Sequence, residues 1–374
     1  MHRDIVVVLG TRPEAIKLAP VILELRTCPE FTVWVCNTEQ QKELSNQTLA
    51  FFGIQPDYTL DIMLPNQTLS ITHVRIITAL DTLFSKKNFD ACIVQGDTMT
   101  ALCGAISSFY HHIPLFHVEA GLRSFKLSEP FPEEGIRRII AQIASLHFTP
   151  TKNAERALLQ ENIKADDIHT VGNTVIDSLL CLSQETMKNA EEQLLDYGIS
   201  LNEKIVLITV HRRENHGIRL QNIIEAIYEL SASFREYIFV IPVHPNPNVL
   251  YSMYSLLKDI PNIKLIEPLE YPTVVLLMKY ARLILTDSGG IQEEAPTFGT
   301  PVLVLRYATE RSEGVEAGFA HLVGTEKQDI FVAASKILSS SSHKTLEHVK
   351  NPYGDGQASQ RITNIVKNYW EYES

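Results

Sequence analysis

The sequence predicts an α/β protein with two Rossmann-like, doubly wound domains facing a central cleft. Its 374 residues exceed what one hydrophobic core usually serves. Short apolar runs rich in β-branched residues alternate with longer segments in which apolar residues recur every three or four positions. Continuous apolar strands joined by helices are typical of a parallel sheet covered on both faces, and this alternation occurs twice along the chain.

In the first half of the chain, apolar runs predict strands and the longer segments between them predict helices. The predicted strands lie at 5–9, 31–36, 91–94, 115–118 and 146–148. The helical spacing is clear at 14–25 and 71–84. We expect these elements to form the first sheet and the helices that cover it.

The second half repeats the pattern. Its predicted strands lie at 204–210, 237–243, 263–266, 282–285 and 301–305. The pattern is weakest at 174–200, where we place the domain boundary. The predicted domains are 1–172 plus 357–374, and 173–356. The last helix follows the turn-rich segment 351–356, which lets it pack back on the first domain.

Charge, cysteine usage and hydropathy limit the classes of function. The net charge of −11 argues against a nucleic-acid-binding surface, which needs clustered Lys and Arg, but permits a small anionic ligand. The five cysteines have no paired spacing, and no metal-ligand pattern occurs. The first apolar run is too short for a signal peptide, and no stretch approaches the roughly 20 apolar residues of a membrane span. We therefore expect a cytoplasmic protein without a metal ion.

Polar side chains gather where the predicted strands end. In open α/β sheets, ligands bind beyond the carboxyl ends of the strands. One polar residue directly after a strand is usually an ordinary helix cap. A series of strand ends that combines carboxylates, imidazoles and arginine instead predicts a site between the two halves. The exits are Gly10-Thr11-Arg12, Gln95-Gly96-Asp97-Thr98, Glu119-Ala120-Gly121, His211-Arg212-Arg213-Glu214, His244, Glu267 and Asp287-Ser288-Gly289-Gly290.

Two of these exits are suited to phosphate. Ser288-Gly289-Gly290 opens a predicted helix, where glycines let backbone N–H groups approach a phosphate, and Glu294 follows one turn on, within reach of a ribose. Arg12 leaves the first strand in the same manner, with Lys17 one turn later. The alternatives are an N-capped tight turn and solvated basic side chains. No G-x-G-x-x-G follows the first strand and no P-loop sequence occurs, which disfavours a nicotinamide dehydrogenase and a P-loop kinase.

Asp97, Glu119 and the pair Glu133-Glu134 are the candidate acid–base groups. Carboxylates at strand ends that face a closed cleft lose solvation, which favours proton transfer near neutral pH. The alternative is that they are solvated, or that the Glu pair supplies ordinary charges to the first turn of a helix. His211 and His244 end strands, where each either donates to a phosphate oxygen or has a structural role.

In these motifs the chain resembles the non-hydrolysing UDP-N-acetylglucosamine 2-epimerases, a family with a two-domain fold of the glycosyltransferase-B type. The matching motifs occur in the family's order and cover nearly the whole chain. They are Gly10-Thr11-Arg12-Pro13-Glu14-Ala15-Ile16-Lys17, Gly96-Asp97-Thr98, His117-Val118-Glu119-Ala120-Gly121-Leu122-Arg123, Pro130-Phe131-Pro132-Glu133-Glu134, Gly172-Asn173-Thr174-Val175-Ile176-Asp177, His211-Arg212-Arg213-Glu214-Asn215, Asp287-Ser288-Gly289-Gly290-Ile291-Gln292-Glu293-Glu294-Ala295-Pro296 and Asn351-Pro352-Tyr353-Gly354.

The resemblance implies reversible C2 epimerisation of UDP-N-acetylglucosamine to UDP-N-acetylmannosamine, without metal or cofactor, in a homodimer that supplies surface polysaccharide synthesis. The C2 proton is removed while UDP leaves C1, giving a 2-acetamidoglucal, and UDP then adds back as a proton reaches the opposite face. The implied catalytic residues are Asp97, Glu119, Glu133 and His211. The implied contacts with the UDP-sugar are Arg12, Lys17, Arg137, His211, Ser288, Gly289, Gly290, Glu294 and Arg311.

The chain departs from the family pattern at several positions. In bacterial relatives a second, activating UDP-sugar can bind in a region that corresponds here to Gln40, Glu43, Glu133, Arg212 and His244. Glu39 and Gln41 replace the family's usual Gly or Ala and His, which leaves activation open. Ile136 replaces the Asn usual before the Arg pair, and Val274 replaces an aromatic residue that would wall the uracil pocket.

Three other functions share some of these features. A hydrolysing relative would release free N-acetylmannosamine and UDP. A glycosyltransferase on the same fold would have a similar donor site, but no use for the C2 base that Asp97, Glu119 and Glu133 provide. A regulator that senses the UDP-sugar without turning it over would not need these carboxylates either. The carboxylates therefore favour an epimerase over the transferase and the regulator, and the hydrolysing relative stays open as an alternative.

Overall fold

The computed structural model divides the chain into two compact units. It describes residues 2–64, 67–340 and 350–371. The first unit comprises Met1–Cys181 and Tyr353–Ser374, and the second comprises Leu182–Pro352. The helix α7 (Thr174–Leu180) lies in the first unit, where the hydroxyl of Ser178 donates to the carbonyl of Ile16 at 2.6 Å. The two units divide after α7, inside the segment 174–200 where the sequence placed the boundary and beyond residue 172, where it ended the first domain.

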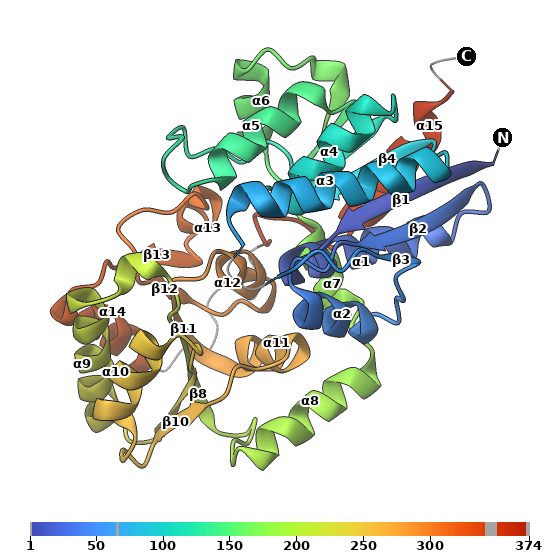
Figure 1. Ribbon diagram of the computed structural model, residues 1–374. Helices are drawn as coiled ribbons and strands as arrows, with labels where there is room; N and C mark the ends of the chain where they lie inside the picture. Colours follow the sequence, from blue (N-terminus) through green and yellow to red (C-terminus); the bar gives the residue numbers. More distant parts are fainter. Residues whose placement is uncertain (1, 65–66, 341–349, 372–374) are drawn as a thin grey trace. The chain divides into compact units, whose positions relative to one another are not determined.

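The first unit contains a seven-stranded parallel sheet in the order β3-β2-β1-β4-β5-β6-β7. Figure 1 labels strands β1 to β4 of this sheet. Its strands are β1 (Arg3–Leu9), β2 (Phe31–Asn37), β3 (Tyr58–Thr59), β4 (Ala91–Gln95), β5 (Leu115–Val118), β6 (Leu146–Thr149) and β7 (Ile168–Thr170). The strands predicted from the first half of the sequence are confirmed. The edge strands β3 and β7 have two and three residues, too few for a sequence pattern to predict.

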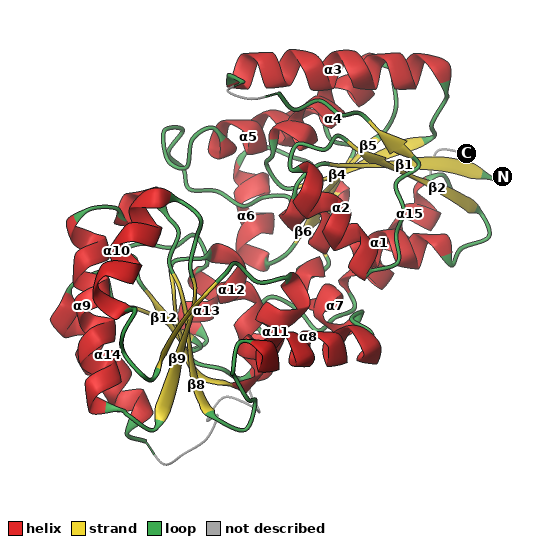
Figure 2. Cartoon of the chain, turned by 60° about the horizontal axis from the view of Figure 1, so that its bottom comes forward, coloured by secondary structure: helices red, strands yellow, loops and turns green. Residues whose placement is uncertain are grey.

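Helices cover both faces of this sheet. Figure 2 shows α3 and α4 on one face and α1 and α15 on the other. The helices of this unit are α1 (Arg12–Arg26), α2 (Lys42–Phe51), α3 (Leu69–Lys86), α4 (Met99–Tyr110), α5 (Glu133–Ile143), α6 (Lys152–Gln160), the 3-10 turn η1 (Ala165–Asp167), α7 and α15 (Ala358–Tyr369). The C-terminal α15 packs here because Tyr369 meets Phe116 of β5 edge to face, with ring centroids 4.9 Å apart.

The second unit contains a six-stranded parallel sheet in the order β10-β9-β8-β11-β12-β13. Its strands are β8 (Lys204–Thr209), β9 (Tyr237–Pro242), β10 (Ile263–Ile266), β11 (Ala281–Thr286), β12 (Val302–Val304) and β13 (Ala320–Leu322). The strands predicted from the second half are confirmed, and the edge strand β13 is again too short to predict. The α/β class with two Rossmann-like parallel sheets is therefore confirmed.

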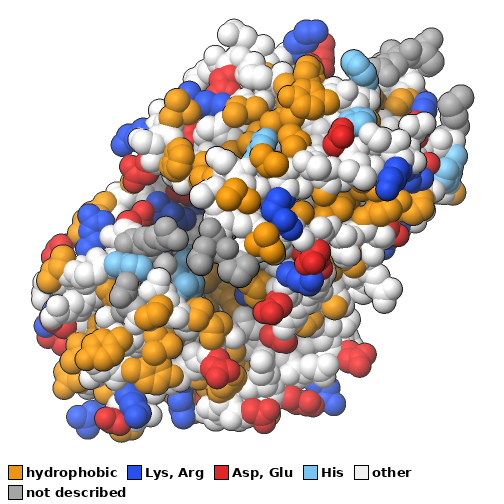
Figure 3. Space-filling model, in the orientation of Figure 1, with side chains coloured by type: hydrophobic (Ala, Val, Ile, Leu, Met, Phe, Trp, Pro, Cys, Tyr) orange, Lys and Arg blue, Asp and Glu red, His pale blue; other side chains and the backbone are white. Residues whose placement is uncertain are grey.

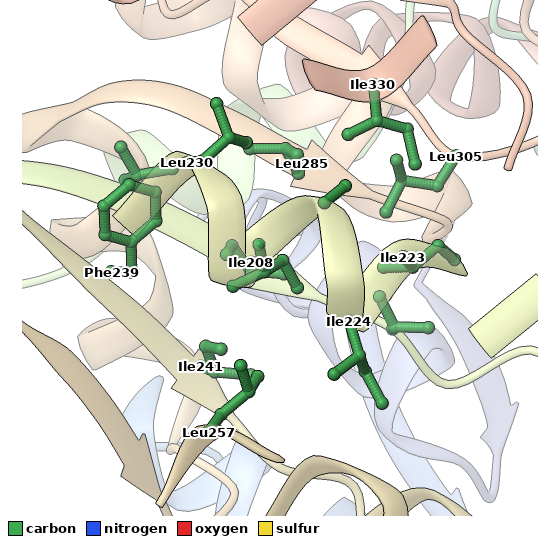
Figure 4. Packing of buried hydrophobic residues seen from close by; sticks show 14 of the residues in the cluster. Ile208, Ile223, Ile224, Leu230, Phe239, Ile241, Leu257, Leu285, Leu305 and Ile330 are labelled. Atoms are coloured by element: carbon green, nitrogen blue, oxygen red, sulfur yellow. The ribbon is translucent and has the colours of Figure 1, made fainter. Parts of the chain in front are cut away.

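The core of the second unit lies between its sheet and helices α9 and α14. Figure 4 shows Ile208 of β8 and Leu285 of β11 among side chains from α9 and α14, and all of them are buried. The helices of this unit are α8 (Gln184–Asp196), η2 (Arg213–Asn215), α9 (Ile218–Ser233), α10 (Pro247–Leu257), α11 (Tyr271–Tyr280), α12 (Gly289–Glu294), η3 (Ala295–Phe298), α13 (Ser312–Glu316) and α14 (Lys327–Leu338). This burial explains why its strands are continuous apolar runs in the sequence.

Each sheet has a point at which the strand order reverses. In the first unit this point lies between β1 and β4, and in the second it lies between β8 and β11. Chains leaving two such neighbouring strands turn to opposite faces of the sheet, which opens a crevice at their carboxyl ends. The predicted site residues follow these four strands or lie close to them, so the two crevices are the places to examine.

The distribution of charge on the surface and the hydropathy of the helices bear on the predicted class of protein. On the face in Figure 3, acidic and basic side chains are interspersed among apolar and neutral ones. A mixed surface of this kind keeps fields of a single sign small. Among the residues that the structure describes, no helix combines the length and the apolar character needed to span a bilayer.

Candidate functional site

The loop after β1 borders one side of the crevice in the first unit. Gly10 has no room for a side chain, because a Cβ there would collide with the hydroxyls of Thr38 and Thr100. The backbone N–H of Arg12 donates to the side chain of Gln41 at 3.0 Å. These contacts hold the loop close to its neighbours and leave the Arg12 side chain half-buried at the strand exit.

The buried carboxylate of Glu14 joins this loop to the turn after β4. One oxygen accepts from the backbone N–H groups of Gly10 at 3.1 Å and Thr11 at 2.8 Å, and from the Thr11 hydroxyl at 2.8 Å. The other oxygen accepts from the Thr98 hydroxyl at 2.6 Å. Burial raises the pKa of Glu14 to about 7, although its donors favour the charged form.

This raised pKa predicts a pH-dependent stability. Below the ordinary value of 4.5, Glu14 is protonated in the folded and the unfolded chain, and its contribution to stability is fully present. As the pH rises towards 7, the unfolded chain ionises first, so the free energy of unfolding falls by about 3 kcal/mol in total. Glu14→Gln does not titrate and serves as the reference. We expect urea unfolding from pH 4.5 to 8 to show wild type losing stability relative to this variant, and a constant difference would contradict the prediction.

Glu119 lies in the same crevice, just beyond β5. One carboxylate oxygen is 2.5 Å from Nζ of Lys17 on α1, and the other accepts from the side chain of Gln95 at the end of β4. Both Lys17 and Glu119 are buried. The backbone of Glu119 has φ of +61°, a conformation that a residue with a side chain rarely adopts. The fold therefore keeps an unfavourable backbone conformation at Glu119, which places a buried ion pair beside Gly96. Backbone strain of this kind is typical of functional sites.

Asp97 and Arg137 form a second ion pair in the crevice. The Arg137 guanidinium lies 2.6 Å from Asp97 and 3.4 Å from the fully buried Glu134. Glu134 also accepts from the backbone N–H of Ser124 at 2.9 Å, which anchors the loop that precedes α5. Glu133 begins α5, and its Oε2 is buried without a hydrogen-bond partner among the described residues. The structure therefore brings Asp97 and Arg137 together and places Glu133 on the helix that carries Arg137.

The buried His117 supports the turn that carries Asp97. It lies on β5, and its Nε2 is 2.8 Å from the carbonyl oxygen of Gly96. Burial lowers the pKa of His117 to about 3, so the ring is neutral and its Nε2–H donates to this carbonyl at neutral pH. Gly96 has φ of +69°, which glycine adopts without strain.

In the second unit, Asp287 joins the exits of β8 and β11. Its fully buried carboxylate accepts from the backbone N–H groups of His211 at 3.1 Å and Arg212 at 3.0 Å, and from the Asn215 side chain at 2.9 Å. Nδ1 of His211 also lies 3.1 Å from Asp287. Although burial opposes ionisation, the contacts with His211 and the backbone lower the pKa of Asp287. The contact of the carboxylate with Nδ1 orients the half-exposed imidazole of His211.

Three arginines surround Glu310 at the same end of this sheet. Glu310 pairs with Arg311, with Arg306 at 3.2 Å and with Arg212 at 3.9 Å. Although burial raises its pKa, the charges of Arg311 and Arg306 hold the pKa of Glu310 at about 2. Arg311 also pairs with Glu293 at 2.9 Å. The guanidinium groups are thus held by carboxylates in a fixed arrangement, which suits recognition of an anion.

The two glycines that open α12 have different surroundings. A Cβ on Gly289 would lie 2.7 Å from the guanidinium carbon of Arg311, so this glycine allows Arg311 to lie against the backbone. A Cβ on Gly290 would lie 3.4 Å from Oε1 of Glu294, which is a far looser contact. Ser288, Gly289, Gly290, Glu294 and Arg311 therefore lie together at the exit of β11.

The amino-acid sequence matches the family described as UDP-N-acetylglucosamine 2-epimerase over residues 23–367. The UDP-N-acetylglucosamine 2-epimerase of Neisseria meningitidis is 44% identical over 370 residues, which cover 97% of this chain and 99% of that protein. The enzyme of Escherichia coli K12 is 43% identical over 369 residues, covering 97% and 98%. The chain belongs to the UDP-N-acetylglucosamine 2-epimerase family. The predicted family, and the prediction of an enzyme that is an isomerase, are confirmed.

Solved structures agree with this family. The N. meningitidis UDP-GlcNAc 2-epimerase bound to UDP-GlcNAc superimposes with a TM-score of 0.91 at 44% identity, covering 98% of this chain and 100% of that one. The S. aureus protein MnaA, solved with UDP, gives a TM-score of 0.89 at 41% identity, covering 99% and 97%. A glycosyltransferase of kitacinnamycin, at 12% identity and a TM-score of 0.68 over 98% and 99% of the two chains, shares the fold alone.

Sequence reasoning missed several residues that build these crevices in the 2-epimerase fold. Glu14 belongs to a local capping box, Thr11-x-x-Glu14, which the spacing could have indicated. Asp287 was noted only as part of a strand exit and His117 only as a member of a motif, and Glu310 was not singled out. Their partners lie far away in the sequence, so no local signal indicates what they hold.

The residues predicted for an activating site lie in both units. Gln40 accepts from the backbone N–H and the hydroxyl of Thr100 at 3.2 and 2.8 Å, so its carbonyl oxygen binds within the first unit. Glu43 is exposed on α2. In the second unit, the His244 ring stacks on His211 with centroids 6.1 Å apart, and Arg212 donates to the carbonyl of Asp287 at 2.8 Å. Their role in activation stays a prediction.

Proposed function

We propose that the chain interconverts UDP-N-acetylglucosamine and UDP-N-acetylmannosamine by inverting C2. The observation that carries the proposal is two ion pairs in one crevice, the buried pair of Glu119 with Lys17 and the partly buried pair of Asp97 with Arg137. A glycosyltransferase or a sensor of the UDP-sugar has no need for two carboxylates held in this way. Named 2-epimerases that match over nearly the full length, one of them solved with UDP-GlcNAc, support the same substrate.

The proposed reaction proceeds by elimination and re-addition. A carboxylate removes the C2 proton, the C2–H electron pair becomes the C1–C2 double bond, and the C1–O bond to UDP breaks. UDP then adds to C1 of the 2-acetamidoglucal while a proton is delivered to the opposite face of C2. Because the C2 proton is barely acidic, the leaving diphosphate must carry most of the developing charge, and removing one preorganised donor there commonly costs on the order of 3 kcal/mol. Holding both fragments keeps the return step unimolecular.

The proposed roles follow the division into units. The first unit supplies the acid–base carboxylates Asp97, Glu119 and Glu133. The sugar and diphosphate contacts proposed in this unit are Arg12, Lys17 and Arg137. The second unit supplies the UDP contacts, which are His211, Ser288, Gly289, Gly290, Glu294 and Arg311. His211 is the proposed donor to the leaving diphosphate, because its contact with Asp287 fixes Nδ1 and directs Nε2 outward.

We further propose a homodimer, in which exposed apolar side chains of the first unit lie at the interface. Leu69, Ile71 and Val74 lie in the first half of α3 and are between 48 and 59% exposed. Large exposed apolar groups that lie close together are typical of subunit contacts. Sedimentation should give twice the mass of one chain, and a monomer at micromolar concentration would contradict the proposal.

The product would be an activated N-acetylmannosamine donor for surface polysaccharide.

Proton NMR of the purified chain with UDP-N-acetylglucosamine in deuterated water tests the proposed function. We expect UDP-N-acetylmannosamine beside the starting material, with deuterium at C2 of both sugars. Accumulating free N-acetylmannosamine would instead identify a hydrolysing enzyme. No exchange in protein that binds UDP would exclude the proposed reaction. A sigmoidal dependence of rate on substrate would support activation through Gln40, Glu43, Arg212 and His244, and a hyperbolic one would argue against it.

The contact between Gly289 and Arg311 predicts the effect of a single methyl group. Gly289→Ala places Cβ 2.7 Å from the guanidinium carbon of Arg311 and must displace it. We expect UDP to bind roughly tenfold more weakly, because relieving such a clash costs about 1–3 kcal/mol. Gly290→Ala is the matched comparison, with a looser contact and a smaller expected effect. Equal Kd values for the two variants by calorimetry would refute the role of this contact.

A further inference from the structure

The crevice of the first unit is bordered by two loops that leave the sheet in opposite directions. After β1 the chain enters α1, and after β4 it enters α4, on the other face of the sheet (Figure 2). Arg12 follows the first of these strands and Asp97 follows the second. Pairing of β1 with β4 fixes where the two loops begin, and beyond the strand ends side chains that cross the crevice join the loops.

Glu14 makes that crossing. Its Oε2 accepts the backbone N–H groups of Gly10 and Thr11 and the Thr11 hydroxyl, and its Oε1 accepts the Thr98 hydroxyl. The side chain is 0% exposed, so water does not compete for these bonds. A charged or polar group buried in this way holds its partners firmly, because any partner that moves away leaves an unsatisfied group behind.

Thr98 connects Glu14 to Asp97, the residue directly before it in the chain. Its hydroxyl accepts from the backbone N–H of Ala101 at 2.9 Å, which caps α4, and donates its own hydrogen to Glu14. The residue directly before it is Asp97, whose carboxylate pairs with Arg137. A shift of Thr98 would therefore move Asp97 and its partner.

We propose that Glu14 is a positioning residue for the C2 epimerisation, fixing Asp97 relative to the Arg12 loop through Thr98. This inference rests on the proposed function. Glu14 itself has no contact with reacting atoms and acts only through the two loops.

The second unit also joins its two strand exits through a buried carboxylate, which here follows the later of the two strands. There the fully buried Asp287, after β11, binds the backbone N–H groups of His211 and Arg212 after β8. In each unit, one buried carboxylate thus joins the two strand exits that border the crevice. The recurrence supports a positioning role, since in both crevices a buried carboxylate joins the loops beyond the ends of the paired strands.

Variants at Thr98 test the link with a matched control. Thr98→Val keeps the shape but removes the hydroxyl, whereas Thr98→Ser keeps the hydroxyl. Because Thr98→Val also removes a helix cap, Thr151→Val is the control: the Thr151 hydroxyl accepts from Ala154 N–H and caps α6 in the same unit, far from the loops in question along the chain. Glu14→Gln removes the charge and one acceptor from the other end of the link.

At pH 8 we expect Thr98→Val and Glu14→Gln each to lower kcat by roughly 10- to 100-fold, the size of effect that a small misplacement of a reacting group produces. In Thr98→Val, KM and the Kd for UDP should stay within about twofold, because Gly10 and Thr11 keep their hydrogen bonds to Glu14. Thr98→Ser should keep most of kcat, and the double variant should lose no more than the worse single variant. Thr151→Val should lower Tm as Thr98→Val does and leave kcat unchanged.

Three outcomes would overturn the inference: an unchanged kcat in Thr98→Val, a parallel change of kcat, KM and the Kd for UDP, or an equal loss of kcat in Thr151→Val. Wild type that shows no C2 exchange would overturn the proposed function instead. Amide hydrogen exchange then still tests whether Glu14 holds the loop after β4. The backbone amides of residues 96–98 should exchange faster in Glu14→Gln than in wild type. Unchanged protection of these amides would exclude the contact as a positioning link.

Discussion

Asp97→Asn is expected to lower kcat by roughly 10³-fold, since a positioned acid–base group contributes about 10² to 10⁴. The amide cannot accept the C2 proton, yet it keeps the size of the side chain and one oxygen for Arg137, which lies 2.6 Å from Asp97. Deuterium incorporation at C2, measured by proton NMR, should fall with the rate of epimerisation. The Kd for UDP should change little, because the amide leaves an oxygen for Arg137 and the substitution touches none of the other proposed UDP contacts.

The control for this substitution is Asp166→Asn, which replaces an exposed carboxylate of η1 in the same unit. It should leave kcat and the Kd for UDP as they are in wild type. If Asp97→Asn keeps more than a tenth of wild-type kcat, Asp97 does not transfer the proton. If it also weakens UDP binding, the role of Asp97 would be structural and the proposed division between the units would need revision.

Asp287→Asn is expected to damage both catalysis and folding. The carboxylate accepts from two backbone N–H groups, from Asn215 and from His211, and an amide would present a donor to at least one of them. Leaving such buried groups unsatisfied should lower the free energy of unfolding by about 1–3 kcal/mol or more. The imidazole of His211 would also lose its orientation, and removing a carboxylate that orients a histidine can lower kcat by roughly 10⁴-fold. Urea unfolding and steady-state kinetics measure the two effects.

Separating the two effects requires a variant that spares the backbone contacts. His211→Gln leaves Asp287 bonded to the backbone N–H groups of residues 211 and 212 and should retain most of the stability, while kcat falls. Asp329→Asn, an exposed carboxylate on α14, is the control for a surface charge. Equal kcat in wild type and His211→Gln would remove His211 from the mechanism and assign Asp287 a purely structural role.

Much of the fold was predictable because the signal is local. Strands such as β1, β4 and β8 lie in the middle of parallel sheets and are buried on both faces, so each is a continuous apolar run. The edge strands β3, β7 and β13 were not predictable, since two or three residues carry no periodicity and only a neighbouring strand makes them part of a sheet. The helix α7 belongs to the first unit through a contact between Ser178 and Ile16, residues far apart in the sequence.

The candidate site divides in the same way. The sequence indicated Asp97, Glu119 and the glycines of α12, because they follow predicted strands and because their motifs resemble the family. It did not indicate which groups pair. The contact of Glu119 with Lys17 joins residues 102 positions apart, and that of Glu14 with Thr98 joins residues 84 apart.

By itself, therefore, the sequence determined the family, the α/β class and the strand exits at which polar residues gather. These features follow from apolar periodicity and from motifs of neighbouring residues, which are present in the chain before it folds. Only the tertiary structure decided that Glu14 and Asp287 each join two strand exits, and that Arg212, Arg306 and Arg311 gather around Glu310. The physical reason is that buried charges are tolerated only where partners reach them, and parallel strands bring such partners together from distant parts of the chain.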